Sequence, residues 1–143
     1  MLKESFHKSI LTNQNSKEIL YCIALYQKNN GLSDVKKLSA SSFSVEHIMP
    51  KKWEQNWSTP NMSEQEKAER NILLLTLGNL TLITKKLNSK LKNDSWYNKK
   101  ETLRKYSSLQ LTTDYLTLDI WDEAAINIRA DNLVNLVLEM WKK

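Results

Sequence analysis

The sequence predicts a mostly helical α+β domain, and three observations lead to this class. The chain has 143 residues, the size of one domain, and its 41% apolar residues suffice for a single core. Only two glycines and two prolines occur, which favours helices over glycine-rich sandwiches and phosphate loops. Short β-prone runs lie between longer segments of helical periodicity. We expect one compact unit, with a helical lead-in over 1–39 and the main domain over 40–143.

Apolar residues at helical spacing predict helices over about 17–29, 64–75, 85–92, 95–106 and 120–141, with a short piece beginning at 112. Residues that cap helices precede most of them, namely Asn15 or Ser16, Ser63, Asp94 or Ser95, and Asp119. Ser63 and Glu66 have the spacing of a capping box, in which each side chain bonds the other residue's backbone.

Two short strands are predicted, over 43–48 and around 80–83, with a turn at 77–79 before the second. Pro50 has no backbone donor and suits the end of the first strand. Strict alternation places Glu46 and His47 on opposite faces, so the two can serve one site only if the strand ends or bulges there.

Several classes of protein are excluded by composition. One cysteine, Cys22, cannot form an internal disulfide or a cysteine-based zinc site, and its apolar surroundings predict a buried thiol. No run approaches the roughly 18 apolar residues that a membrane helix needs. The first residues lack the apolar core of a signal peptide. We therefore expect a soluble, cytoplasmic protein without a membrane partner.

The positive charge is concentrated in one window. The chain carries a net charge of +5, and residues 85–105 hold eight bases against two acids, so this window is +6 and the remainder −1. Such a stripe is typical of a phosphate-binding face, although a solvated helix surface gives the same pattern. The lysines assigned here to DNA contact are Lys85, Lys86, Lys90, Lys92, Lys99 and Lys100.

The candidate site combines Glu46, His47, Asn79 and Asn88. Hydrolysis of a phosphodiester needs a base for the attacking water, and an imidazole titrates near neutral pH. A hard cation such as Mg²⁺ takes oxygen ligands from one or two protein groups and completes its shell with water and phosphate. Glu46 and Asn88 can supply such oxygens, while Asn79 can orient the imidazole by hydrogen bonding. The pattern predicts a one-metal nuclease site.

These residues also resemble a known family. The run Glu46-His47-Ile48-Met49-Pro50, then Leu77-Gly78-Asn79-Leu80-Thr81-Leu82, then Asn88, resembles the HNH (His-Me finger) nucleases. It is most similar to the branch that forms the C-terminal domain of GmrSD-like type IV, modification-dependent restriction enzymes. The context matches that branch too, through Trp53, Lys99-Lys100, Trp121, Ile126 and Arg129. The likeness covers roughly residues 40 to 143.

The resemblance implies a ββα-metal motif embedded among additional helices. It implies that His47 is the general base, that Asn79 orients it, and that Glu46 and Asn88 bind the metal, Mg²⁺ or Mn²⁺. Many HNH enzymes carry Asp in the place of Glu46. The zinc-binding cysteine pairs of some HNH proteins are absent, so packing around Trp96 and the last helix is expected to hold the motif instead.

Three functions remain open at this point. The leading hypothesis is a metal-dependent endonuclease that nicks or cleaves double-stranded DNA, including modified phage DNA, in bacterial antiviral defence. Members of this branch usually carry an N-terminal nucleotide-hydrolysing sensor domain, which these residues do not supply. The alternatives are a catalytically silent DNA-binding module and a helical protein-interaction domain.

Overall fold

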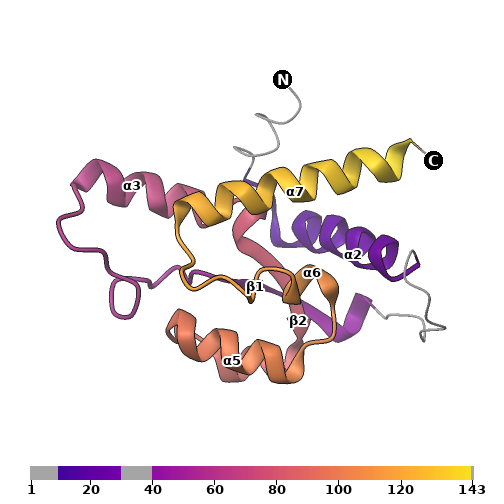
Figure 1. Ribbon diagram of the computed structural model, residues 1–143, viewed down its shortest axis with the longest axis horizontal. Helices are drawn as coiled ribbons and strands as arrows, with labels where there is room; N and C mark the ends of the chain where they lie inside the picture. Colours follow the sequence, from indigo (N-terminus) through magenta and orange to yellow (C-terminus); the bar gives the residue numbers. More distant parts are fainter. Residues whose placement is uncertain (1–9, 30–39, 143) are drawn as a thin grey trace.

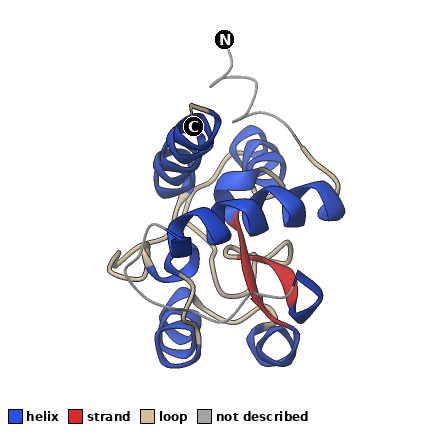
Figure 2. Ribbon diagram, turned by 90° about the vertical axis from the view of Figure 1, so that its right-hand side faces the viewer, coloured by secondary structure: helices blue, strands red, loops and turns tan. Residues whose placement is uncertain are grey.

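The structure, a computed structural model, describes residues 10–29 and 40–142. Two antiparallel strands lie in the middle of the molecule and helices surround them (Figures 1 and 2). The mostly helical α+β class is therefore confirmed. In chain order the elements are α2 (Asn13–Asn29), η1 (Ala40–Ser42), β1 (Phe43–His47), α3 (Glu64–Leu73), η2 (Leu77–Asn79), β2 (Leu80–Thr84), α4 (Lys85–Leu91), α5 (Trp96–Tyr106), α6 (Gln110–Thr113) and α7 (Glu123–Trp141).

Two of the predicted helix starts are confirmed. Ser63 and Glu66 form the reciprocal bonds of a capping box at the start of α3. Ser95 caps α5 by accepting a hydrogen bond from the Asn98 backbone. These caps depend on neighbours within one helical turn, which is why local sequence is enough to find them.

The predicted starts of three other helices were wrong. Helix α2 begins at Asn13, and the Thr12 hydroxyl, rather than Asn15 or Ser16, accepts a hydrogen bond from a first-turn backbone amide. Helix α7 begins after Asp122, whose side chain accepts from Ala125, and not after Asp119. The piece expected to begin at residue 112 is α6, which begins at Gln110. In each case an alternative capping or starting residue lay within a few positions.

The sheet register decides which face each strand residue occupies. Strand β1 pairs with β2 so that Glu46 lies opposite Thr81 and His47 lies opposite Leu80. One face of the pair packs on a core with α2, and the other packs on a core with the aromatic residues of α5 and the segment before α7. Helix α4 follows β2 directly and packs on both strands. The start of β1 thus lies beside the start of α4, because Phe43 pairs with Thr84, the residue before that helix.

Tryptophans brace this region. Trp53 and Trp57, in the loop after β1, are buried, and their indole N–H groups donate to Asn71 Oδ1 and to the Asp94 carbonyl. Trp96 packs against Trp121, with ring centroids 5.7 Å apart. The expected packing around Trp96 is confirmed, and Trp53, Trp57 and Trp121 are buried with it, whereas Trp141, at the end of α7, is exposed.

Gly78 permits α7 to approach the turn before β2. A Cβ at this position would clash with the backbone oxygen of Ile126. Arg129, also on α7, is buried and donates to the carbonyls of Gly78 and Leu80, at 3.0 and 2.6 Å. The guanidinium therefore satisfies backbone oxygens of the turn, which fixes the segment that carries Asn79.

Cys22 is exposed, so its predicted burial was wrong. The buried positions of α2 around it are Leu20, Ile23 and Ala24. Cys22 lies in an apolar run but on the other side of the helix, so an apolar neighbourhood in sequence did not mean burial in space.

Candidate active site

Strand β1 ends at His47, so a strand end is present where the sequence required an end or a bulge. Within the strand, Glu46 and His47 still lie on opposite faces, because they pair with the successive residues Thr81 and Leu80. In an extended strand, successive side chains and successive carbonyls point in opposite directions. The carbonyl oxygens of His47 and Ile48 nevertheless both accept hydrogen bonds from one group, Lys99 Nζ, at 2.9 and 3.1 Å. The chain therefore leaves the extended conformation just after the imidazole-bearing residue.

Glu46 lies on the face of β1 that faces α5, and it is buried, with 7% of its surface exposed. Its Oε1 lies 3.8 Å from Lys99 Nζ, whereas Oε2 is buried without a hydrogen-bond partner among the described residues. Burial raises the pKa of Glu46, and the Lys99 ammonium and the nearby backbone amide of His47 oppose this by lowering it. An unpartnered carboxylate oxygen in a buried position is what a cation-binding group requires.

The imidazole of His47 is partly exposed. Burial lowers its pKa from 6.5 to about 4, and the ammonium groups of Lys51 and Lys99 contribute in the same direction. The ring is therefore neutral at physiological pH, the form in which an imidazole accepts a proton.

Asn79 does not hydrogen-bond the imidazole, although the sequence had led us to expect this. The amide of Asn79 is fully buried and bonds both backbone groups of Met49, two residues beyond His47. It also donates to the Leu74 carbonyl and accepts from Trp121 Nε1. Asn79 can therefore position His47 only through the backbone that follows β1.

Asn88 lies on α4, on the same side of β1 as Glu46. Its amide nitrogen donates to Ser44 Oγ at 3.0 Å, and Ser44 shares the face of Glu46 by alternation. Because the donor end of the amide is occupied by Ser44, the carbonyl oxygen is the end left for a cation.

The oxygen atoms of Glu46 and Asn88 are of the type that a hard divalent cation prefers. Within residues 10–29 and 40–142 no cluster of three His, Cys, Asp or Glu side chains occurs, so a closed protein cage of the zinc type is not formed there. Glu46 Oε2 and the Asn88 amide oxygen are both oxygen donors, which Mg²⁺ and Mn²⁺ prefer over sulfur. Water and substrate phosphate would have to complete such a shell.

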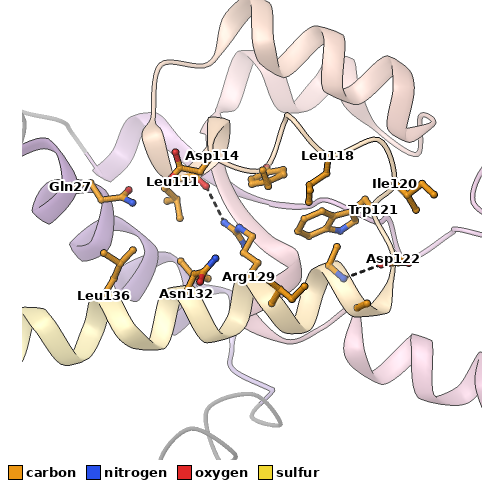
Figure 3. A pocket seen from close by; sticks show the side chains of 15 residues that line it. Gln27, Leu111, Asp114, Leu118, Ile120, Trp121, Asp122, Arg129, Asn132 and Leu136 are labelled. Carbon is orange, nitrogen blue, oxygen red and sulfur yellow. Dashed lines mark hydrogen bonds between the residues drawn. The ribbon is translucent and has the colours of Figure 1, made fainter.

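A cavity of about 400 Å³ lies elsewhere, between α7 and the segment that precedes it (Figure 3). Trp121 and Arg129 line it, while Glu46, His47 and Asn88 do not. Its walls are mostly apolar, with the exposed Ile120 and Ile128 at its edge. The candidate residues Glu46, His47 and Asn88 are thus separate from this cavity.

The family model of the C-terminal domain of GmrSD restriction endonucleases matches residues 1–136. The chain belongs to this family. Searches of curated proteins and of solved structures found no match. Membership in the GmrSD C-terminal family implies a nuclease domain of the restriction-endonuclease type, with DNA as its substrate. The match also begins well before the domain boundary that we expected near residue 40, and that boundary stays a prediction.

Five of the six lysines assigned to DNA contact in this GmrSD C-terminal domain lie at least partly at the surface. Lys85, Lys86, Lys90 and Lys92 are exposed on or just after α4. Lys100 is half-buried and its ammonium donates to the Leu118 carbonyl. Lys99 has no exposed surface, so its assignment to DNA was wrong. Nothing in the part of the chain that the structure describes is long and apolar enough to span a membrane as a helix.

The lowered pKa of His47 predicts an acid-sensitive contribution to the stability of the domain. The folded pKa of about 4 lies below the ordinary value of 6.5, so between these values the unfolded chain binds more protons and stability falls as pH falls. Relative to His47→Ala, we expect the unmodified chain to lose about 1–2 kcal/mol between pH 7 and pH 4, a figure reduced for partial exposure. Urea unfolding in EDTA measures this, and parallel pH profiles for the two chains would contradict it.

Proposed function

We propose that this domain hydrolyses phosphodiester bonds of double-stranded DNA as a metal-dependent HNH-type endonuclease. The observation that carries the proposal is the buried Glu46 Oε2, which has no hydrogen-bond partner among the described residues. Asn88 lies on the same side of the strand as this carboxylate, and His47 follows Glu46 at the end of β1. Glu46 and Asn88 would hold Mg²⁺ or Mn²⁺ through oxygen atoms. When bound, the cation supplies charge stabilisation at the scissile phosphate and the leaving oxygen.

The residues of the chain itself divide the remaining work. The neutral His47 imidazole accepts a proton from the attacking water, which is the task of a general base. Asn79 holds Met49, and so limits the motion of the backbone just beyond His47. The exposed lysines of α4 lie on the same helix as Asn88 and bind the phosphates that flank the scissile bond, without reading sequence.

The biological setting that we infer is bacterial defence in the cytoplasm against phage DNA, including modified DNA. The family description as a restriction endonuclease domain supports this setting. A nucleotide-hydrolysing sensor domain or subunit would license the cut, and it would have to come from outside this sequence because no Gly-rich Lys-Ser/Thr phosphate loop is present in it.

Nicking of supercoiled plasmid by the purified chain tests the proposed function. We expect open-circular product with Mg²⁺ or Mn²⁺ and none with EDTA. Binding to the plasmid without nicking under any of these metals would favour a catalytically silent DNA-binding module. Absence of both binding and nicking at low salt would favour a protein-interaction domain.

Replacing lysines of α4 tests the DNA-binding surface separately from catalysis. We expect the combined Lys85→Ala, Lys86→Ala and Lys90→Ala variant to bind duplex more weakly, with a salt slope that falls by about one for each phosphate the variant no longer neutralises. Fluorescence anisotropy at several salt concentrations measures both quantities. Lys67→Ala on α3, where Lys67 pairs with Glu64, is the matched control and should bind as the unmodified chain does. An unchanged salt slope in the triple variant would show that α4 does not bind DNA.

A further inference from the structure

Lys99 is a buried cation at the end of the strand that carries the candidate site, and none of the functions above uses it. The residue has no exposed surface, although it lies in the most basic window of the sequence. An ammonium group removed from water is destabilising unless its N–H groups and its charge are satisfied by protein. The groups that satisfy it therefore indicate what it stabilises.

The Lys99 ammonium makes hydrogen bonds and an ion pair with three consecutive residues, 46 to 48. Its Nζ donates to the carbonyls of His47 and Ile48, at 2.9 and 3.1 Å, and lies 3.8 Å from Glu46 Oε1. Asn79 holds the same stretch through its backbone oxygen on the Ile48 amide and its side chain on Met49. The peptide units that follow the imidazole are thus fixed by two independent residues from different elements.

The two oxygens of Glu46 have different surroundings as a result. Oε1 faces the Lys99 ammonium, while Oε2 is buried and has no partner among the residues described. A carboxylate that is held through one oxygen has a defined orientation for the other. Lys99 can therefore set the direction in which Glu46 presents Oε2 to a cation.

We propose that Lys99 is a positioning residue for DNA cleavage, acting through the His47–Ile48 backbone and the Glu46 carboxylate rather than through DNA. This inference rests on the proposed function of Glu46 and His47. A positioning residue sets the geometry in which base and cation act together, and misplacement by about 1 Å is enough for a 10²-fold loss of rate. Because Lys99 has no surface exposed to DNA, its replacement should leave the affinity for duplex largely unchanged.

The test compares Lys99→Met with Arg70→Met. Arg70, on α3, is a matched control, since it is also a buried cation that donates to a backbone carbonyl, that of Trp57, and forms an ion pair with a carboxylate, that of Glu123. Both variants should lose stability in urea. At a temperature where both remain folded, we expect Lys99→Met to lose about 10²-fold in kcat with the Kd for duplex within a few-fold of the unmodified value. Arg70→Met should keep its kcat.

A spectroscopic readout separates positioning from stability. The sequence has two histidines, His7 and His47, so the ring signals of His47 are assigned by their disappearance in His47→Ala. We expect these signals to shift in Lys99→Met and to stay in place in Arg70→Met. An unchanged kcat in folded Lys99→Met, or an effect confined to KM and the salt slope of DNA binding, would overturn the proposal.

Two further outcomes have defined meanings. If Lys99→Met does not fold, Lys99→Arg is the deciding variant, because it keeps the charge but changes the donor geometry. We expect this variant to have about a tenfold lower kcat with normal DNA binding. Full kcat in Lys99→Arg would refute a positioning role. If the unmodified chain fails to cleave, the proposed function is at fault. The His47 signals then still decide whether Lys99 positions the strand end.

Discussion

Replacing His47 by Ala is expected to lower the rate of DNA cleavage by roughly 10²–10⁴-fold, the contribution of a general base. The imidazole is neutral at physiological pH because burial lowers its pKa to about 4. The proposed role of the ring is to accept a proton from water rather than to hold the fold, so the variant should fold and bind duplex nearly as the unmodified chain does. Single-turnover cleavage with saturating Mg²⁺ measures the change in rate.

The control for this substitution is His7→Ala, at the only other histidine of the sequence. No role proposed above falls on His7, so this variant should cleave at the unmodified rate. Nicking by His47→Ala at a rate within a few-fold of the unmodified chain would remove His47 from the chemistry. Equal reductions in both variants would point to a general effect of histidine removal and not to a base at position 47.

Replacing Asn79 by Ala should produce the largest loss of stability. Four backbone or side-chain partners, two on Met49 and one each on Leu74 and Trp121, would be deprived of a buried hydrogen bond. Each buried group left unsatisfied costs about 1–3 kcal/mol, so we expect the free energy of unfolding to fall by about 3–5 kcal/mol when part of the cost is relieved by relaxation. Urea denaturation at neutral pH in EDTA measures it.

Asn88→Ala is the matched comparison, because it removes the same amide from a partly exposed position. The Asn88 amide donates to Ser44, and removing this one bond should change stability by no more than about 1 kcal/mol. The substitution should instead raise the metal concentration needed for cleavage. Similar changes of stability in the two variants would show that the hydrogen bonds of Asn79 are not the structural centre of the site.

Local sequence was sufficient for much of the fold. The alternation of apolar and polar residues located β1, and Pro50 indicated where β1 ends. The capping box of Ser63 located α3. Both signals operate over fewer than about eight residues, within which side-chain spacing and capping chemistry determine the backbone. The order of Glu46, His47, Asn79 and Asn88 also led to the correct family. Where two acids stood near a helix start, as before α7, the local signal did not decide between them.

The environment of the site could not be read in the same way. Asn79 was expected to hydrogen-bond the imidazole of His47. It bonds the backbone N–H and carbonyl of Met49 instead, and only the folded chain brings these groups close to Asn79. Lys99 was grouped with the surface lysines because charge alone was considered. Its helical spacing to Trp96 and Leu103, both buried on α5, places it on the apolar stripe, and that signal would have found it. The carbonyls that satisfy it are about fifty residues away in sequence.

Binding of Mn²⁺ to the cleavage-deficient His47→Ala chain, followed by electron paramagnetic resonance, tests most directly whether Glu46 and Asn88 form a metal site. We expect one ion to bind weakly without DNA and more tightly when duplex supplies phosphate oxygens, and we expect Glu46→Gln to abolish this gain. Equal affinity with and without duplex, or an unchanged gain in the Glu46→Gln chain, would contradict a metal centre at the end of β1.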